Sequence, residues 1–206
     1  MSWYDFFSLF YDRTLEDRYA PFRSKAFTTE SLGQGSVVLD LACGTGQNFP
    51  YLHNVLGQNV QILGVDLSKG MLKRAEKRIK KEGWQKTTCL QKSALSLSKE
   101  DLQEHLGQSK VDIIVCSLGL TAFPDWEQAF ANSFDLLKPG GRYLIFDVHA
   151  ETRSFNTKTV EFVARADILR RVWEPLETQA SDFSMEFLDN SIKEFGGKLF
   201  FATGTK

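Results

Sequence analysis

The chain has 206 residues, of which 42% are hydrophobic and 25% charged, and its formal net charge is −1. This size and composition suit one α/β domain with an ordinary hydrophobic core. The near-neutral charge gives no overall basic footprint for nucleic acid. The three cysteines, Cys43, Cys89 and Cys116, are widely separated and show no metal-ligand spacing, and their odd number argues against a disulfide framework.

The chain shows no sign of a targeting or membrane-spanning segment. Its N-terminus lacks a basic stretch followed by an apolar one, so no signal peptide is expected. The longest apolar run, around residues 113–123, is too short and too broken to span a bilayer. We therefore expect a cytoplasmic protein without a transmembrane segment. No linker or internal repeat divides it, so a single domain over residues 1–206 is expected.

Residues 1–27 are unusually aromatic, and Trp3, Phe6 and Phe10 recur at helical spacing. This pattern predicts a helix whose apolar stripe packs on the domain. A second interpretation is a lid that excludes water from a ligand-binding mouth. A third is an interfacial helix in contact with lipid. The mixed charges of residues 1–23 do not favour the third interpretation, because an anionic membrane attracts a basic helix face.

A short apolar run from Val37 to Leu41 predicts a buried parallel strand. Gly44 and Gly46 follow it, and glycine lets the backbone turn tightly and approach a ligand closely. A helix is then expected over residues 48–56. A strand, a glycine loop and a helix N-terminus together form the ligand crevice of an open α/β sheet.

The residues of this loop separate two classes of nucleotide-like cofactor. A dinucleotide fingerprint, Gly-x-Gly-x-x-Gly, uses its third glycine to let helix and strand pack closely. Here Phe49 occupies that third position, and an acid, Asp40, precedes the glycines. Two other interpretations remain open at this point: a glycine turn that binds no ligand, and a nicotinamide enzyme with a variant loop.

Residues 61–66 form a second predicted buried strand, which ends in Asp66. An acid at this place can accept hydrogen bonds from both ribose hydroxyls of a nucleoside. Ser68 is predicted to cap a helix over residues 69–82, which Gly83 ends. The many lysines and arginines of this helix indicate a solvated face rather than an RNA site, because no aromatic residues are interleaved.

The rest of the chain continues to alternate between predicted strands and predicted helices. Strands are expected over residues 87–92, 111–117 and 142–148. Helices are expected from Ser98 with Asp101 as a capping box to Gly107, and from Asp125 with Gln128 as caps through Leu137. Residues 150–180 indicate a helix with a substrate-side loop, and residues 182–203 hold two β-rich runs around Gly196-Gly197.

Three stretches occur in an order and at a spacing typical of one superfamily. They are Asp40-x-x-x-Gly-x-Gly46, Gly64-Val-Asp-Leu-Ser-x-x-Met-Leu72 and Leu136-Leu-Lys-Pro-Gly-Gly-Arg142. Over about residues 11–148 the chain resembles the class I S-adenosylmethionine-dependent methyltransferases. Tyr11-Asp12 resembles the Tyr-Asp pair before the first motif of ubiquinone/menaquinone-type C-methyltransferases and of bacterial phosphatidylethanolamine N-methyltransferases.

The resemblance implies an α/β, Rossmann-like, doubly wound sheet of seven strands, mostly parallel with an antiparallel last strand, and helices on both faces. It implies one S-adenosylmethionine-dependent methyltransferase domain over residues 1–206, with residues 1–27 as an aromatic helical lid segment. The cofactor would be S-adenosyl-L-methionine. Ser93 stands where the family often has an acid beside the adenine, so a hydroxyl or backbone amide would have to serve there.

The cofactor-binding residues that the resemblance implies lie in the N-terminal segment, in the first two motifs and at the ends of the third and fourth strands. They are Tyr11, Asp40, Ala42, Cys43, Gly44, Thr45, Gly46, Asp66, Leu67, Met71, Ser93, Ala94, Ser117 and Leu118. We interpret Cys43 as a packing residue and not as a nucleophile.

Methyl transfer from a sulfonium is an in-line displacement in which a protein mainly supplies proximity, alignment and a water-poor site. A base is needed only if the acceptor must lose a proton. His149, at a strand's C-terminal end, is a candidate, although a single histidine is at least as often structural. His53 and His105 fall on predicted helices away from the crevice. No catalytic residue is assigned, and no metal-binding cluster is visible in the sequence.

The favoured function is therefore methyl transfer to a small-molecule or lipid acceptor, with no nucleic acid as partner. The loop at residues 118–123 contains no Asn-Pro-Pro-Tyr-like motif, which argues against the amino-methylating DNA and glutamine enzymes. Two alternatives remain: transfer of the aminocarboxypropyl arm of the same cofactor to a lipid headgroup, and a non-catalytic binding module. The sequence does not name the acceptor, the attacked atom or the oligomeric state.

Overall fold

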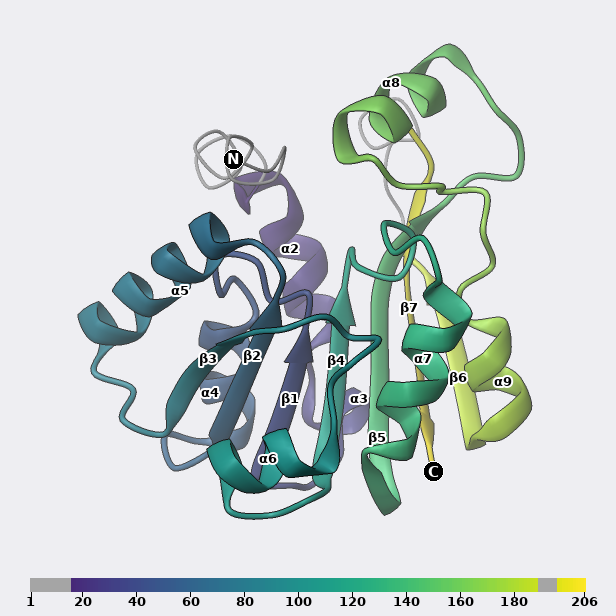
Figure 1. Cartoon of the computed structure of the whole chain (residues 1–206). Helices are drawn as coiled ribbons and strands as arrows, with labels where there is room; N and C mark the ends of the chain where they lie inside the picture. Colours follow the sequence, from purple (N-terminus) through teal and green to yellow (C-terminus); the bar gives the residue numbers. More distant parts are fainter. Residues whose placement is uncertain (1–15, 189–195) are drawn as a thin grey trace.

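The structure is a computed structural model that describes residues 16–188 and 196–206. These residues form one seven-stranded sheet with helices on both faces (Figure 1). The strands are β1 (Val37–Leu41), β2 (Gln61–Asp66), β3 (Thr87–Gln91), β4 (Val111–Ser117), β5 (Leu137–His149), β6 (Ser181–Phe187) and β7 (Lys198–Thr205). Their order across the sheet is β3-β2-β1-β4-β5-β7-β6. The first five strands are parallel, and β7 runs antiparallel to both β5 and β6. The predicted fold class is confirmed.

The described residues also form eight helices. They are α2 (Glu16–Ala26), α3 (Thr29–Leu32), α4 (Phe49–Leu56), α5 (Lys69–Glu82), α6 (Lys99–Leu106), α7 (Trp126–Asp135), α8 (Phe155–Ala164) and α9 (Glu174–Gln179). Two separate buried hydrophobic clusters show which helices cover which face of the sheet. Residues of α6, α7 and α9 belong to one cluster, and residues of α2, α3, α4 and α5 belong to the other. The sheet therefore lies between two helical layers (Figure 1).

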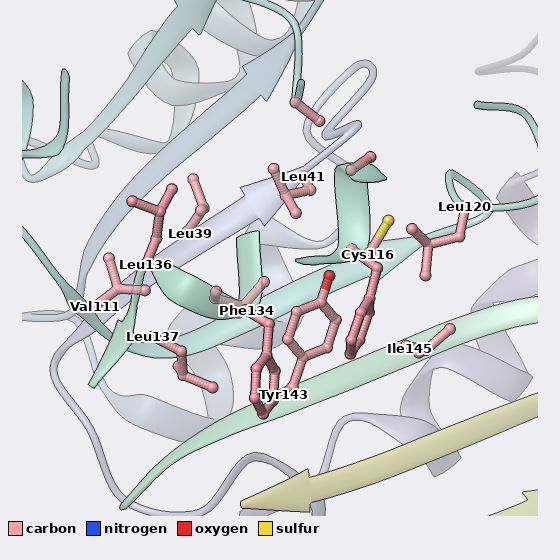
Figure 2. Close-up of a cluster of buried hydrophobic side chains, with 14 of the residues drawn as sticks. Leu39, Leu41, Val111, Cys116, Leu120, Phe134, Leu136, Leu137, Tyr143 and Ile145 are labelled. Carbon is pink, nitrogen blue, oxygen red and sulfur yellow. The ribbon is translucent and has the colours of Figure 1, made fainter. Parts of the chain in front are cut away.

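Alternation along β1 sends its side chains to both layers. Leu39 and Leu41 belong to the cluster under α6, α7 and α9, whereas Val38 belongs to the cluster under α2 to α5. Figure 2 shows the first cluster, in which Tyr143 of β5 lies beside Phe134 of α7, with ring centroids 6.3 Å apart. The same alternation points Asp40 toward the layer that contains α2, a placement that decides its partners.

Local capping chemistry sets the helix boundaries that the sequence predicted well. The Ser68 hydroxyl accepts a hydrogen bond from the Met71 amide at 3.2 Å, and Gly83 ends α5 in the left-handed conformation. Ser98 and Asp101 form the expected capping box of α6. Both helices begin one residue after their predicted cap, as the cap convention requires.

The boundary between α7 and β5 was predicted wrongly. The expected helix ran from Asp125 through Leu137, but α7 ends at Asp135 and the Asp125 side chain makes no capping hydrogen bond. Leu137 instead begins β5 and pairs with Val111 of β4. Pairing with a distant strand competes with helix propensity here, and a local pattern does not report it. The single helix expected in residues 150–180 is also two helices, α8 and α9.

The N-terminal prediction is tested only in part. Tyr11, Asp12 and the aromatic residues before them lie outside the described residues. Within α2 and just beyond it, Tyr19 and Phe27 are buried at 8% and 3% exposure. These two rings therefore pack on the domain, as the first interpretation of residues 1–27 requires. The lid interpretation stays a prediction.

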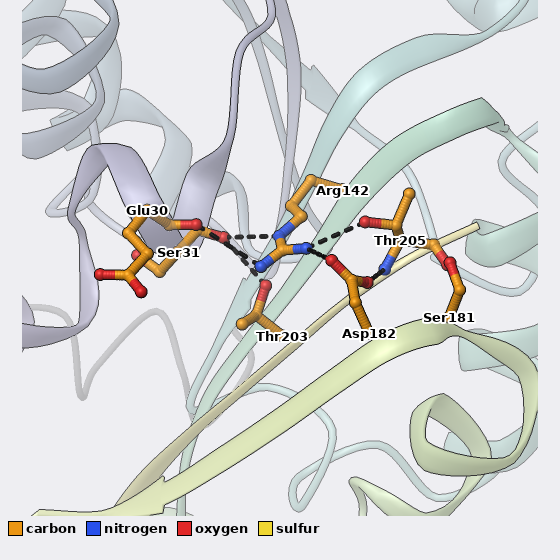
Figure 3. A network of polar contacts seen from close by, with 7 residues as sticks. All are labelled: Glu30, Ser31, Arg142, Ser181, Asp182, Thr203 and Thr205. Carbon is orange, nitrogen blue, oxygen red and sulfur yellow. Dashed lines mark hydrogen bonds and ion pairs between the residues drawn. The ribbon is translucent and has the colours of Figure 1, made fainter.

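A network at the amino-terminal end of β5 joins the antiparallel strands to the parallel core (Figure 3). The Arg142 guanidinium donates to the Asp182 carboxylate, to the Thr205 hydroxyl at 2.9 Å and, through Nε, to the Ser31 carbonyl at 3.1 Å. Thr203 donates to the same carbonyl at 2.9 Å. Arg142 closes the third sequence motif, and its role in the structure is to hold α3, β5, β6 and β7 together.

None of the helices within residues 16–188 and 196–206 has the length and hydropathy that a membrane span requires.

Candidate functional site

The site is built on the loop of residues 42–48 after β1, called the glycine loop below. Ala42, Gly44 and Gly46 have φ angles of 51°, 56° and 77°, a region that glycine tolerates best. A Cβ at Gly46 would lie 2.6 Å from the Phe49 ring, whereas one at Gly44 would meet only the Ala42 carbonyl at 4.0 Å. Gly46 is thus required by packing, and Gly44 leaves the loop's outer side open to a ligand.

Phe49 explains why this loop differs from a dinucleotide loop. Its ring is fully buried and lies 2.7 Å from where a Cβ at Gly64 of β2 would stand. The aromatic ring therefore fills the space between α4 and β2 that a dinucleotide fold keeps small with its third glycine. The distance between helix and strand is set by a side chain here.

Asp66, at the end of β2, connects the glycine loop to the start of α5. One carboxylate oxygen accepts from the Gly44 amide at 3.0 Å, and the other accepts from the Ser68 amide at 2.8 Å. The Asp66 carboxylate thus supports the start of α5 and lies beside the glycine loop at the end of β2.

Asp40, the acid before the glycines, is completely buried. Its Oδ1 accepts from the Asn48 side-chain amide at 2.7 Å, and its Oδ2 has no hydrogen-bond partner among the described residues. Burial raises the pKa of Asp40 to about 7, against the lowering effects of the Asn48 hydrogen bond and the Arg23 guanidinium, and the Asp66 charge adds to the rise. A buried carboxylate oxygen without a donor is costly unless a ligand satisfies it.

Arg23 of α2 reaches this carboxylate indirectly. Its guanidinium donates to the Asn48 side-chain oxygen and, at 3.4 Å, to that of Gln47. The same group lies 5.5 Å from the centre of the Phe146 ring. Sequence reasoning missed Arg23, Gln47 and Asn48. The available signals were an arginine within an aromatic helical segment and two side-chain amides directly after the glycines.

The ends of β2 and β3 present apolar side chains beside the glycine loop. Leu67 is 65% exposed and Leu95 42% exposed, both high for leucine. The Lys92 amide donates to the Asp66 carbonyl at 3.2 Å, so the two strand ends lie side by side. The Ser93 hydroxyl accepts from the Leu95 amide at 3.2 Å, which shapes the turn after β3. Two exposed leucines at one edge suit a flat apolar ligand group.

The end of β4 completes the crevice. Ser117 is 7% exposed, and its hydroxyl has no hydrogen-bond partner among the described residues. Leu118 follows with a φ of 54°. A Cβ at Gly119 would lie 2.8 Å from the Ala42 side chain, so the chain after β4 packs directly on the glycine loop.

The expected cofactor-binding residues fall into three groups. Asp40, the loop residues 42–46, Asp66 and Leu67 gather with Ser117 and Leu118 at the carboxyl ends of β1, β2 and β4. Ser93 and Ala94 follow β3, and Met71 lies in the first turn of α5. Tyr11 lies outside the described residues.

Cys43 and Thr45 are the buried side chains of the expected cofactor-binding residues within the glycine loop. The neighbouring Cys89 side chain and burial raise the pKa of the Cys43 thiol, which stays protonated. A protonated buried thiol is a poor nucleophile, which supports the interpretation of Cys43 as a packing residue. Thr45 is 2% exposed, and its carbonyl accepts from the Arg78 side chain of α5 at 3.2 Å.

A second buried acid, Asp147 of β5, fixes the loop between β4 and α7. It accepts from the Thr121 hydroxyl at 2.8 Å, from the Thr121 amide at 3.3 Å and from the Val148 amide at 2.8 Å. Burial raises the pKa of Asp147 to about 6, although these hydrogen bonds lower it. The sequence placed Asp147 at a strand end but gave it no role.

The geometry favours a structural role for His149. Its ring is 5% exposed and stands edge-on to Trp173 with centroids 4.8 Å apart. Nδ1 lies 3.3 Å from the Arg170 carbonyl, and Nε2 lies 3.6 Å from the Glu151 carboxylate. His53 is also packed, against Trp84, and contacts the Thr87 hydroxyl at 2.9 Å. Within the described residues, no three His, Cys, Asp or Glu side chains are grouped as a metal site requires.

Two open hollows lie beyond the β4 end, on the side away from β2. One, of about 380 Å³, is lined by Thr121, Ala122, Pro124, Arg153, Glu161, Arg165, Ala166, Asp167 and Arg170. The other, of about 490 Å³, is lined by Pro124, Asp125, Trp126, Glu127, Gln128, Ala131 and Arg170. Arg170 borders both and donates to the Phe123 carbonyl at 2.6 Å. A polar acceptor would find arginine and carboxylate groups here.

An open α/β sheet with a glycine loop at the switch point of its strand order is the architecture in which α/β proteins bind nucleotide-like ligands. Residues 39–143 match the family model described as "Methyltransferase domain", and the chain belongs to this family.

Curated relatives agree with this membership. A demethylmenaquinone methyltransferase of Anoxybacillus flavithermus is 26% identical over 135 residues, which are 66% of this chain and 54% of the relative. A ubiquinone/menaquinone biosynthesis C-methyltransferase of Shewanella piezotolerans is 30% identical over 183 residues, 82% of this chain and 64% of the relative. The chain spans about half the length of the first of these relatives.

The fold has close counterparts among solved structures. The geranyl diphosphate C-methyltransferase of Streptomyces coelicolor, solved with S-adenosyl-L-homocysteine, superposes with a TM-score of 0.71 at 15% identity. The match covers 91% of this chain and 76% of that one. At this identity the likeness supports the fold, and the site must be argued from the residues themselves.

Proposed function

We propose that this domain binds S-adenosyl-L-methionine in the crevice at the carboxyl ends of β1, β2 and β4 and transfers its methyl group to a small-molecule or lipid acceptor. One observation carries the proposal: a fully buried carboxylate oxygen of Asp40 and the Asp66 carboxylate flank an open glycine loop. Such a site offers acceptors to a ligand that is cationic at one end and hydroxylated in its middle. The family match and the similar methyltransferases support it.

The residues present fit the parts of this cofactor. Asp66, at the end of β2, would accept hydrogen bonds from the ribose hydroxyls. Leu67 would lie against the adenine with Met71, Ser93 and Ala94, and the exposed Leu95 extends the same apolar surface. The glycine loop would pass along the methionine arm, whose ammonium would donate to Asp40 Oδ2. Tyr11 and the lid role of residues 1–27 belong to the same proposal.

When bound, the cofactor supplies an already activated methyl group. The chain's own residues orient the reactants and limit water at the transfer point. The buried Asp147 holds Thr121 and so fixes the chain after β4, where Ser117 and Leu118 would face the cofactor. We assign no proton transfer to His149, because packing and its contacts with Arg170 and Glu151 hold its ring.

The acceptor class follows from the relatives and the hollows. The similar proteins are named for methylation of menaquinone and ubiquinone precursors, which are small molecules with lipid character. In this chain the hollows at Arg170 would receive the polar part of an acceptor. No feature of the described residues favours aminocarboxypropyl transfer, or a binding module without catalytic activity, over methyl transfer. The mass gained by the acceptor separates these outcomes.

A ligand screen by thermal unfolding tests the cofactor assignment. A ligand that binds only the folded state at 100 times its dissociation constant stabilises it by about 2.7 kcal/mol. S-adenosyl-L-homocysteine should therefore raise the melting temperature, and NAD and NADP should not. Stabilisation by NAD without stabilisation by the homocysteine product would reverse the assignment.

A further inference from the structure

We propose that Arg23 of α2 is a positioning residue of the cofactor site, which acts through Asn48 to hold the Asp40 carboxylate in place for a cationic group of the ligand. This inference rests on the proposed function, because it assumes that a cofactor with an ammonium group binds beside Asp40. It assigns a role to a helix that precedes the glycine loop in the sequence.

The contacts form a continuous relay from α2 to β1. The Arg23 guanidinium donates to the Asn48 side-chain oxygen, and the amide nitrogen of the same side chain donates to Asp40 Oδ1 at 2.7 Å. A second guanidinium nitrogen donates to the Gln47 side chain at 3.4 Å. Asn48 thus has its oxygen on the cation and its nitrogen on the carboxylate. This arrangement fixes the orientation of the Asn48 side-chain amide. In the flipped orientation its NH2 group would face the guanidinium, another donor, and its oxygen would face the carboxylate, another acceptor.

Burial makes the relay matter energetically. Arg23, Asn48 and Asp40 are 3%, 2% and 0% exposed. Buried charges are tolerated when they are paired and hydrogen-bonded, and here a side-chain amide bridges the two. The Phe146 ring under the guanidinium adds a cation–π contact at 5.5 Å. Loss of the arginine would leave Asp40 with one hydrogen bond and no nearby cation from this relay.

The charged and titratable groups around Asp40 come from four elements. Arg23 of α2 favours its ionised form, and the Asp66 carboxylate of β2 opposes it. Two buried thiols, Cys43 in the glycine loop and Cys116 of β4, also face it, and the Asp40 charge raises the pKa of each. Among these groups Arg23 is the cation, so its removal should raise the pKa of Asp40 further. A protonated Asp40 would bind a cationic group less well.

The test compares two ligands that differ in the amino-acid arm. S-adenosyl-L-homocysteine carries the ammonium, and 5′-methylthioadenosine has the same nucleoside without it. Dissociation constants would be measured by calorimetry at pH 6, 7 and 8.5 for the wild type, Arg23→Met and the control Lys25→Met. Lys25 is an exposed residue of the same helix. Melting curves of the unliganded proteins would be recorded alongside.

We expect Arg23→Met to weaken the homocysteine ligand about tenfold at pH 7, with a smaller loss at pH 8.5, where more of Asp40 is ionised. Its affinity for methylthioadenosine should stay within about twofold of the wild type, and Lys25→Met should match the wild type for both. Asn48→Ala, which breaks the relay and keeps the arginine, should show the same ligand selectivity, and it decides the question if Arg23→Met does not fold.

Equal losses for both ligands would overturn the inference, because they would mean that Arg23 only supports the loop. Unchanged affinity for the homocysteine ligand would overturn it as well. Failure of the wild type to bind either ligand would instead contradict the proposed function.

Discussion

At the scale of single residues, the Asp66 carboxylate holds two backbone amides and faces the crevice at once. It accepts hydrogen bonds from the Gly44 and Ser68 amides at 3.0 and 2.8 Å, so its geometry is fixed before any ligand arrives. A ribose that donates hydrogen bonds to this carboxylate would require little reorganisation of the protein. Hydrogen bonds to charged groups contribute about 1.5–3 kcal/mol each.

Asp66→Asn should therefore weaken binding of S-adenosyl-L-homocysteine by roughly 10- to 100-fold, at about 1.4 kcal/mol per decade. The substitution keeps an acceptor for the Ser68 amide but loses the charge and the acceptor for Gly44. The start of α5 should hold, so the unliganded melt should change only slightly. Calorimetric titration measures the affinity, and Asp135→Asn, an exposed carboxylate at the end of α7, is the control. Full retained affinity would make Asp66 a structural residue only.

The sequence predicted the residues of this site where their partners are near in the chain or where a motif marks them. Asp40, Gly44, Gly46 and Asp66 are of this kind. Arg23 could not be predicted to meet Asn48, because the two residues are 25 positions apart and only the packing of α2 on the sheet brings them together. Asp147 was likewise visible as an acid at a strand end, but its partner Thr121 depends on the path of a loop.

At the scale of elements, the contact between β5 and the loop after β4 depends on a buried acid. Asp147 is 1% exposed and accepts three hydrogen bonds from Thr121 and Val148. Burial raises its pKa from 3.8 to about 6, so the folded state holds a proton more tightly than the unfolded state does. This contribution to stability is fully present below the unfolded pKa and is lost as pH rises through about 6.

Asp147→Asn, a neutral mimic of the protonated acid, should remove this pH dependence. The wild type should lose stability relative to the variant between pH 5 and pH 8, by about 1.4 kcal/mol. Only the difference is informative, because burial lowers the pKa of His53 and so makes stability rise with pH over the same range. Urea unfolding of both proteins at the two pH values measures the difference. A constant difference would mean that Asp147 ionises normally.

Element boundaries were predictable where local chemistry sets them. Ser68 and Gly83 bound α5, and Ser98 and Gly107 bound α6, through caps within a few residues. The start of β5 was not predictable in this way. Leu137 joins the sheet because Val111 lies opposite, and the pairing shifts register before Ile113. A tertiary contact outweighs the local helical pattern there.

At the scale of the whole molecule, the two ends of the sheet have different roles. The carboxyl ends of β1, β2 and β4 carry the candidate site, whereas Arg142 at the other end of β5 ties together α3, β6 and β7 (Figure 3). The seven-stranded sheet with an antiparallel last strand was expected from the family resemblance and not from periodicity. The register of β7 against β5 and β6 comes from long-range pairing that no local pattern records.

The central claim is that S-adenosyl-L-methionine binds at the carboxyl ends of β1, β2 and β4, between Asp40 and Asp66. A crystal structure of the chain grown with S-adenosyl-L-homocysteine tests it most directly. The claim predicts ribose hydroxyls within hydrogen-bond distance of the Asp66 carboxylate and the ligand's ammonium within hydrogen-bond distance of Asp40 Oδ2. Density for the ligand in the hollows at Arg170, with the glycine loop unoccupied, would contradict it.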